Sequence, residues 1–324
     1  MILLEVRNLK VAFKSEKEEF IAIDDVSFSI DKRETVALIG ESGSGKSITS
    51  LSMLGLLPRN GQVIGGHVFY EDKDLLLLDQ KELQQIRGKK ISMIFQDASI
   101  SLNPSMKIGK QITEGLAYHR MMNREELKCE ALRLLTKVGF HKPTEVFNQY
   151  PGQLSGGMKQ RALIAMAISC NPQLIIADEP TTALDVTTQK QILDLMNDYK
   201  QTTGTSILFI THDFGLVAEY ADRVIVMFGG KIVETADVFT LFKNPVHPYT
   251  KGLMNSIPKI EEPRDHLLTI RDAVSEEAAY EGRIFAPETF SADEKVYHSP
   301  STLIEVEPGH HVRFFTESPE VSNI

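Results

Sequence analysis

GESGSGKS, at residues 40–47, follows the apolar run 36–39 and precedes a helix-like segment at 48–54. It fits the pattern G-x-x-x-x-G-K-[ST] in the strand, loop and helix context that phosphate binding requires. Glycines let successive backbone N–H groups turn toward phosphate oxygens, and the helix N-terminus adds the positive end of a dipole. The stretch therefore predicts a P-loop that binds a nucleoside triphosphate.

The positions of this loop have separate expected roles. Lys46 reaches the terminal phosphates, and the Ser47 hydroxyl ligates Mg²⁺. Ile48, at the next position, is assigned no role. A glycine-rich turn without a ligand is the alternative, which the flanking strand and helix disfavour. The remaining members surround the phosphates of the nucleotide: Gly40, Ser42, Gly43, Ser44 and Gly45.

A second apolar strand, at 174–177, ends in the carboxylates Asp178 and Glu179. Such a strand end is where a P-loop protein holds its metal. We expect Asp178 to ligate Mg²⁺ and Glu179 to orient or deprotonate the attacking water. His212 follows the strand at 206–210 and could contact the γ-phosphate from the same sheet edge. The alternatives are solvated carboxylates and a structural histidine.

A third motif, Leu154-Ser155-Gly156-Gly157-Met158, precedes a strongly helical segment at 159–166. A serine at a helix start, with glycines and exposed N–H groups, is a second anion site. A chain with one phosphate cradle has no obvious use for another. The simplest interpretation is that this motif completes a nucleotide pocket of a different subunit.

At these motifs the chain resembles the ATP-binding cassette (ABC) transporter ATPases, over roughly residues 2–260. The resemblance implies that two nucleotide-binding domains pair head to tail, with each ATP between one P-loop and the other domain's LSGGM signature. It also implies four residue roles: Gln96 as the Q-loop glutamine that touches Mg²⁺ or water, Asp185 of the D-loop across the dimer, His212 as the switch histidine, and Phe13 stacking on adenine.

The expected fold is α/β: a P-loop NTPase (RecA-like) core, an antiparallel β subdomain and an α-helical insertion at about 100–153. A capping box at Asn123 and Glu126 predicts one insertion helix through Val138, closed by Gly139. We place the nucleotide-binding domain at 1–250 and a C-terminal extension at 251–324. Buried parallel strands are expected at 91–95, 174–177 and 206–210, and strands of the β subdomain at 3–6, 11–13 and 26–30.

Three further segments resemble the oligopeptide, dipeptide and nickel importer ATPases: Ser101-Leu102-Asn103-Pro104, Tyr150-Pro151 and Asn244-Pro245-Val246-His247-Pro248-Tyr249-Thr250. The resemblance implies two transmembrane permease subunits, an extracytoplasmic substrate-binding protein and a second, related ATPase subunit. It also implies a peripheral location at the cytoplasmic face of the plasma membrane. Peptide is the favoured substrate, and nickel or a metal chelate stays open. By itself, His-Pro-Tyr predicts only a turn with an aromatic residue.

Charge and apolar content bear on other classes. The chain has 324 residues and a net charge of −9. Residues 261–324 contain 14 acidic and 5 basic residues and so carry all of it, while the rest sums to zero. A basic nucleic-acid footprint is missing, so no nucleic-acid partner is expected. No apolar run approaches the roughly 18 to 20 residues that span a bilayer.

The two cysteines, Cys129 and Cys170, are both expected in the core. No cysteine follows Cys170, although relatives in this branch commonly carry a cysteine-rich tail that can hold an iron–sulfur cluster. Without thiolate ligands we expect no such cluster. The segment 305–312 still predicts ordered structure. Its adjacent His310 and His311 would point apart on a strand, which disfavours a metal site.

Four other interpretations are weaker. A metabolite kinase shares the P-loop but does not explain LSGGM. An ABC-type ATPase that acts on DNA or ribosomes would need a coiled-coil insertion, a tandem cassette or a basic surface. Glu179 and His212 argue against a catalytically silent cassette, and an exporter usually carries fused membrane helices. The sequence leaves open whether the working pair is a homodimer or a heterodimer.

Overall fold

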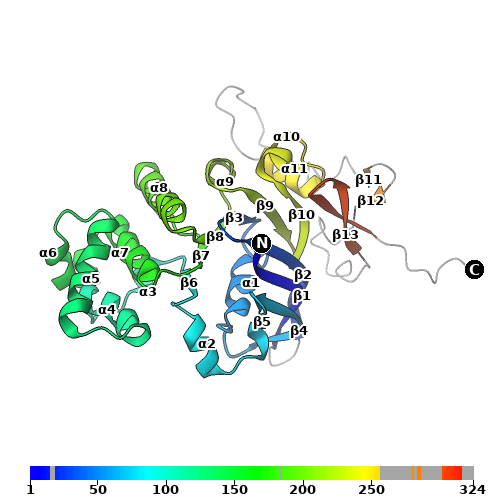
Figure 1. The fold of residues 1–324 in the computed structure, drawn as a ribbon. Helices are drawn as coiled ribbons and strands as arrows, with labels where there is room; N and C mark the ends of the chain where they lie inside the picture. Colours follow the sequence, from blue (N-terminus) through cyan, green and yellow to red (C-terminus); the bar gives the residue numbers. More distant parts are fainter. Residues whose placement is uncertain (15–18, 183, 256–278, 281–282, 286–300, 316–324) are drawn as a thin grey trace, which may run out of the picture. The chain divides into compact units, whose positions relative to one another are not determined.

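The computed structural model describes residues 1–14, 19–182, 184–255, 279–280, 283–285 and 301–315. Its contacts divide the chain into two compact units. The first contains 1–4, 30–35 and 70–210, and the second contains 5–29, 36–69 and the described part of 211–324. Figure 1 labels the elements of both units.

The first unit contains a set of short parallel strands. Strand β7 (Leu174–Asp178) pairs with β6 (Ile91–Ile94) on one side and with β8 (Ser206–Thr211) on the other. Every residue of β7 and β8 is buried, as expected of parallel strands that are covered on both faces. The predicted strands at 91–95, 174–177 and 206–210 are confirmed.

Helices follow β6 in the chain, and α4 to α7 form the green group of Figure 1. Helix α5 begins with the predicted capping box of Asn123 and Glu126. It ends at Lys137, with Val138 as its C-cap, and Gly139 follows with a φ of 90°. The helical elements of the first unit are η1 (Leu75–Leu77), α2 (Gln80–Ile86), α3 (Ala98–Ser101), α4 (Ile108–His119), α5 (Arg124–Lys137), α6 (Pro143–Asn148), η2 (Pro151–Gln153), α7 (Gly156–Ile168) and α8 (Val186–Thr203); the unit also holds the short strand β5 (Lys73–Asp74).

The expectation that both cysteines fill the core is wrong for one of them. Cys170 is buried, but Cys129 is exposed. The buried face of α5 contains Ala131, Leu134 and Leu135. Cys129 precedes Ala131 by two positions, which is roughly 200° around a helix, so it lies on the opposite face.

The second unit begins with a sheet in the order β2 (Glu19–Asp31), β1 (Ile2–Lys14) and β4 (Gly61–Tyr70). Strand β1 is a single strand, although the sequence predicted two short ones. Asn8 joins the two parts with a left-handed backbone, φ 47°. Its N–H donates to Ser27 Oγ at 2.7 Å, and its Nδ2 donates to Asp25 Oδ1 at 2.7 Å. These bonds let the polar middle of the segment stay within the sheet.

Five further strands of this unit form part of another sheet, in the order β3 (Thr35–Ile39), β9 (Arg223–Phe228), β10 (Lys231–Asp237), β14 (His310–Phe315) and β13 (Ser301–Glu307). Strands β3 and β9 are parallel, whereas β9, β10, β14 and β13 pair antiparallel. The C-terminal hairpin β13–β14 therefore extends this sheet, and the predicted order at 305–312 is confirmed. The unit's other elements are α1 (Lys46–Met53), α9 (Phe214–Tyr220), α10 (Val238–Lys243), α11 (Pro248–Asn255), β11 (Ala279–Tyr280) and β12 (Arg283–Ile284).

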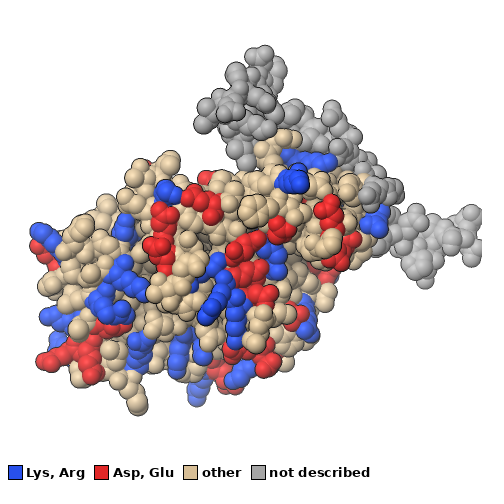
Figure 2. All heavy atoms as spheres, turned by 45° about the horizontal axis from the view of Figure 1, so that its top comes forward, with Lys and Arg blue, Asp and Glu red and all other residues tan. Residues whose placement is uncertain are grey.

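Surface charge is mixed on the face that Figure 2 draws. Lysines and arginines are interspersed there with aspartates and glutamates. Among the residues that the structure describes, no helix has both the length and the apolar character needed to cross a bilayer.

Candidate nucleotide site

The P-loop connects the end of β3 to the start of α1. Gly40 has a φ of 153°, and a Cβ there would lie 2.2 Å from the Met227 carbonyl oxygen. Only glycine fits this close approach. Gly43 has a φ of 84° and open space where a Cβ would be. The left-handed backbone, and not crowding, therefore explains why this position is a glycine.

Lys46 folds back over the loop and is 6% exposed. Its Nζ donates to the carbonyl oxygens of Gly40 at 2.7 Å and Glu41 at 2.8 Å. Gly45, the N-cap of α1, provides no side-chain cap, and the first turn of the helix contains no acidic residue. A buried ammonium group beside an uncapped helix N-terminus fits an anionic phosphate.

In the first unit, Glu179 directly follows β7 and adopts a left-handed backbone, φ 45°. Its N–H donates to the Ile210 carbonyl at 2.9 Å. Its Oε2 accepts from Gln96 Nε2 at 2.8 Å and from Thr182 Oγ1 at 2.9 Å. Asp178, at the end of the strand, is 5% exposed. The structure thus brings two of the predicted site residues, Gln96 and Glu179, into direct contact.

The LSGGM motif and the D-loop also lie together in the first unit. Ser155 is the N-cap of α7 and accepts from the Met158 N–H at 3.4 Å. Asp185 is the N-cap of α8, and its carboxylate accepts from the N–H and hydroxyl of Thr188 at 2.9 and 2.7 Å. These bonds, above all that of the Thr188 hydroxyl, hold the pKa of Asp185 below its ordinary value.

Glycines bring the two motifs close. A Cβ on Gly157 would lie 2.6 Å from Thr188 Cγ2, and one on Gly156 would lie 3.6 Å from Leu184 Cδ2. Ala183, the first D-loop residue, is outside the described residues. The N-terminus of α7 and the start of α8 therefore form one packed surface.

The other predicted residues belong to the second unit, together with the P-loop. Phe13 is half-buried at the end of β1, and a Cβ on Gly61 would meet its ring at 2.8 Å. His212 follows β8 directly and is exposed. Asp213 then caps α9 by accepting from the Gly215 N–H at 2.8 Å. The roles of Phe13 and His212 stay predictions.

Three residues that no sequence motif predicted contact the candidate site: Thr182, Thr188 and Tyr249. Thr182 and Thr188 lie three residues after Glu179 and Asp185, a spacing that could have indicated a local hydrogen bond. The Tyr249 hydroxyl accepts from the N–H of Glu41 in the P-loop at 2.9 Å. A separation of 208 residues hid this contact from any local pattern.

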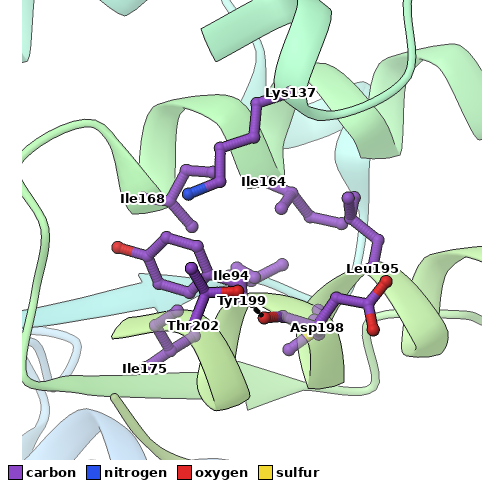
Figure 3. Close-up of a pocket in the computed structure, with 10 residues that line it drawn as sticks. Ile94, Lys137, Ile164, Ile168, Ile175, Leu195, Asp198, Tyr199 and Thr202 are labelled. Atoms are coloured by element: carbon purple, nitrogen blue, oxygen red, sulfur yellow. Dashed lines mark hydrogen bonds between the residues drawn. The ribbon is translucent and has the colours of Figure 1, made fainter. Parts of the chain in front are cut away.

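Figure 3 shows a separate cavity of about 160 Å³ in the first unit. Its walls include Ile94, Ile164, Ile168 and Tyr199. Lys137 points into it, with Nζ 4.5 Å from the centroid of the Tyr199 ring, and burial lowers the pKa of this lysine. The mostly aliphatic lining is unlike the backbone N–H cradle of a phosphate site.

Within the described ranges, no group of three or more His, Cys, Asp or Glu side chains is arranged to hold a metal ion. His310 is buried and His311 is half-buried, so the adjacent rings have different surroundings. The cysteines of relatives would be expected at 282–287 and 312–315, and of these positions 282, 286 and 287 are outside the described residues. The prediction that the tail holds no iron–sulfur cluster stays a prediction.

Known proteins are similar to this chain in both sequence and fold. Residues 23–182 match the family described as ABC transporter, and 233–289 match "Oligopeptide/dipeptide transporter, C-terminal region". The oligopeptide transport ATP-binding protein AppD of Bacillus subtilis (strain 168) is 50% identical over 320 residues, which are 98% of each chain. OppD of the same organism, also an oligopeptide transport ATP-binding protein, is 46% identical over 99% of this chain and 91% of its own.

A solved dimeric ATP-binding cassette, in a post-hydrolysis state bound to ADP and Pi, superposes with a TM-score of 0.66. It is 29% identical and covers 72% of this chain and 98% of its own. The P-loop, the signature motif and this likeness define a P-loop NTPase fold and an ATP-hydrolysing subunit of the ABC type. More narrowly, the chain belongs to the oligopeptide and dipeptide transport ATP-binding proteins.

Proposed function

We propose that this chain powers a peptide importer from the cytoplasmic face of the plasma membrane, as a peripheral subunit. It works there with two permease subunits, an extracytoplasmic substrate-binding protein and a second, related ATPase subunit. The family match at 233–289 and the names of the most similar relatives support peptide as the substrate. We also propose a nucleotide-binding domain at 1–250 and an extension at 251–324.

In this proposal the P-loop holds the phosphates of ATP, with Lys46 leaving its carbonyl partners for the terminal phosphates. Ser47, Asp178 and Gln96 supply oxygen ligands of the kind that Mg²⁺ prefers. Mg²⁺, when bound, neutralises phosphate charge. Phe13 stacks on the adenine, and His212 contacts the terminal phosphate.

The hydrogen bonds of Glu179 are the observation that carries the hydrolytic part of the proposal. Two donors, Gln96 and Thr182, reach its Oε2, and the strand end fixes its backbone. An oriented carboxylate is suited to accept a proton from an attacking water. Because Gln96 contacts Glu179 directly, a movement of the Q-loop would also shift this carboxylate.

The signature surface supports a paired arrangement. Ser155, Gly156, Gly157 and Asp185 lie together at two helix N-termini, where dipoles favour an anion. We propose that this surface closes over the γ-phosphate held by the P-loop of a second subunit. Closure is then favoured by ATP contacts that exist only in the closed pair.

Reconstitution tests the proposal. The chain is assembled in liposomes with its permeases, partner ATPase and binding protein, and ATP hydrolysis is measured with oligopeptides, dipeptides or a nickel chelate. We expect peptides to stimulate hydrolysis and Lys46→Ala to abolish both hydrolysis and uptake. Stimulation by the nickel chelate alone would contradict peptide as the substrate, and an active Lys46→Ala variant would contradict the P-loop assignment.

A further inference from the structure

The peptide group between Gly40 and Glu41 is held at both ends. Its carbonyl oxygen, on Gly40, accepts from Lys46 Nζ at 2.7 Å. Its N–H, on Glu41, donates to the hydroxyl of Tyr249 at 2.9 Å. Gly40 has a φ of 153°, a conformation open to few other residues, and has no side chain to hinder rotation of this peptide. The orientation of the first P-loop peptide therefore depends on these two partners.

We propose that Tyr249 is a positioning residue for the P-loop, and that the C-terminal hairpin β13–β14 supports the nucleotide site through it. The proposal rests on the proposed role of the P-loop in holding ATP. The His-Pro-Tyr segment, for which the sequence predicted only a turn, would then also help to position the P-loop.

Tyr249 itself is rigidly held. It has no exposed surface, and its ring centroid lies 4.5 Å from that of Phe228. Its N–H donates to His247 Nδ1 at 3.1 Å, which fixes the first turn of α11. Burial raises the pKa of Tyr249, so its hydroxyl stays neutral, and the hydroxyl oxygen accepts the Glu41 N–H. A fixed phenol can hold a loop peptide only if its own backbone is anchored.

Glu234 of β10 provides that anchor. Its Oε1 accepts from the Val246 N–H at 2.7 Å, and its Oε2 accepts from the His247 N–H at 3.1 Å. The Oε1 atom also lies 2.8 Å from His310 Nε2 on the hairpin. The side chains of Glu234 and His310 are 0% exposed. One buried carboxylate thus joins the His-Pro-Tyr segment to the hairpin.

The ring of His310 acts as a donor in this arrangement. Its Nδ1 is buried and has no hydrogen-bond partner among the described residues. A proton on Nδ1 would therefore be unpaired, so the favoured form carries its proton on Nε2 and donates to Glu234. A side chain with an N–H at the same place can replace the ring, and an aliphatic side chain cannot.

Further contacts fasten the hairpin to the sheet. Arg313 Nε donates to the Ile232 carbonyl at 2.6 Å, and this side chain is 2% exposed. Phe285 and Phe314 stack with ring centroids 5.1 Å apart, in a buried cluster that includes Val246. The hairpin therefore packs against the start of the His-Pro-Tyr segment.

Nucleotide affinity tests the role of Tyr249. The full-length chain is titrated with the fluorescent analogue TNP-ATP, which ATP then displaces, and thermal unfolding is recorded without nucleotide. Tyr249→Phe removes only the hydroxyl, which accepts the Glu41 N–H, so we expect ATP to bind about 3- to 10-fold more weakly. The matched control is Tyr70→Phe, because Tyr70 is also buried and donates to Gln173 Oε1. It should lose stability but bind ATP within twofold of the natural chain.

Two outcomes separate this inference from the proposed function. If Tyr249→Phe binds ATP as the natural chain does, or no worse than Tyr70→Phe, Tyr249 does not position the loop. Lys46→Ala is measured alongside. If that variant also binds ATP normally, the P-loop assignment itself is wrong.

A pair of His310 variants tests the hairpin. His310→Gln keeps an N–H donor for Glu234, whereas His310→Leu does not. We expect His310→Leu to weaken ATP binding in the same direction as Tyr249→Phe, and His310→Gln to restore it to within twofold. Unchanged affinity in His310→Leu would overturn the link from the hairpin to the P-loop.

Discussion

Glu179 combines an unfavourable backbone with an ordered carboxylate. A left-handed conformation costs a non-glycine residue roughly 1–2 kcal/mol, and such strain clusters at functional sites. The Ile210 carbonyl holds its backbone, and Gln96 and Thr182 hold its side chain. These contacts orient the carboxylate.

Glu179→Gln should lower ATP turnover of the assembled transporter by about 100-fold or more, because an amide cannot accept a proton from water. ATP affinity should stay within threefold, since the P-loop is unchanged. Phosphate release measures turnover, and displacement of TNP-ATP measures ATP affinity. Glu114→Gln, at an exposed position on α4, is the control and should hydrolyse normally. Retained turnover in Glu179→Gln would remove Glu179 from the proposed chemistry.

The methyl group of Thr188 leaves no space for a side chain at Gly157. The Cβ of Gly157→Ala would lie 2.6 Å from Thr188 Cγ2, while the Thr188 hydroxyl is bound to Asp185. We expect Gly157→Ala to lower the free energy of unfolding by about 1–3 kcal/mol. Thr188→Ser removes the methyl and keeps the hydroxyl, so the same substitution in that background should destabilise less. Urea denaturation of the four chains measures this coupling, and equal effects in both backgrounds would contradict it.

At the scale of elements, the His-Pro-Tyr segment connects α10, α11 and the C-terminal hairpin through buried polar groups. His247 is fully buried, and its ring packs edge-on against Phe285. Burial, assisted by the charge of Arg313, lowers the pKa of His247 to about 3. The neutral ring is needed there because its Nδ1 accepts from Tyr249.

The sign of the pH effect follows from this pKa. Below about pH 6.5 the unfolded chain binds a proton on His247 and the folded chain does not, so stability is lost as the pH falls toward 3. This group should cost about 2 kcal/mol of unfolding free energy between pH 7 and pH 5. His247→Asn keeps an acceptor without titrating. Urea denaturation should show a smaller loss in that variant, and an equal loss would contradict the assignment.

Sequence patterns predicted the elements that local chemistry determines. The capping box of α5 and the apolar run of β7 are complete within a few residues, so both could be read directly. Cys129 was misplaced because one helical turn of slightly apolar residues does not fix which face is buried. The bonds of Asn8 and the contact of Tyr249 with Glu41 depend on residues 17 to 208 positions away, which no local pattern contains.

At the scale of the whole molecule, the proposed function gives the chain two different surfaces for a single triphosphate. The P-loop offers an ammonium group and backbone N–H groups in one unit, and Ser155 with Asp185 offers two helix N-termini in the other. The proposed function requires that each ATP be held by the P-loop of one subunit and the signature surface of another. Bound ATP should therefore shield position 155 from solvent only when the subunits are assembled.

Maleimide labelling of Ser155→Cys in the Glu179→Gln chain tests this requirement most directly. Cys129 is exposed and serves as the internal reference. In the assembled transporter, ATP with Mg²⁺ should slow labelling of residue 155 by at least about tenfold and leave Cys129 unchanged, whereas the chain diluted to a monomer should show no protection. Equal labelling of residue 155 with and without bound ATP in the assembled transporter would contradict the shared site.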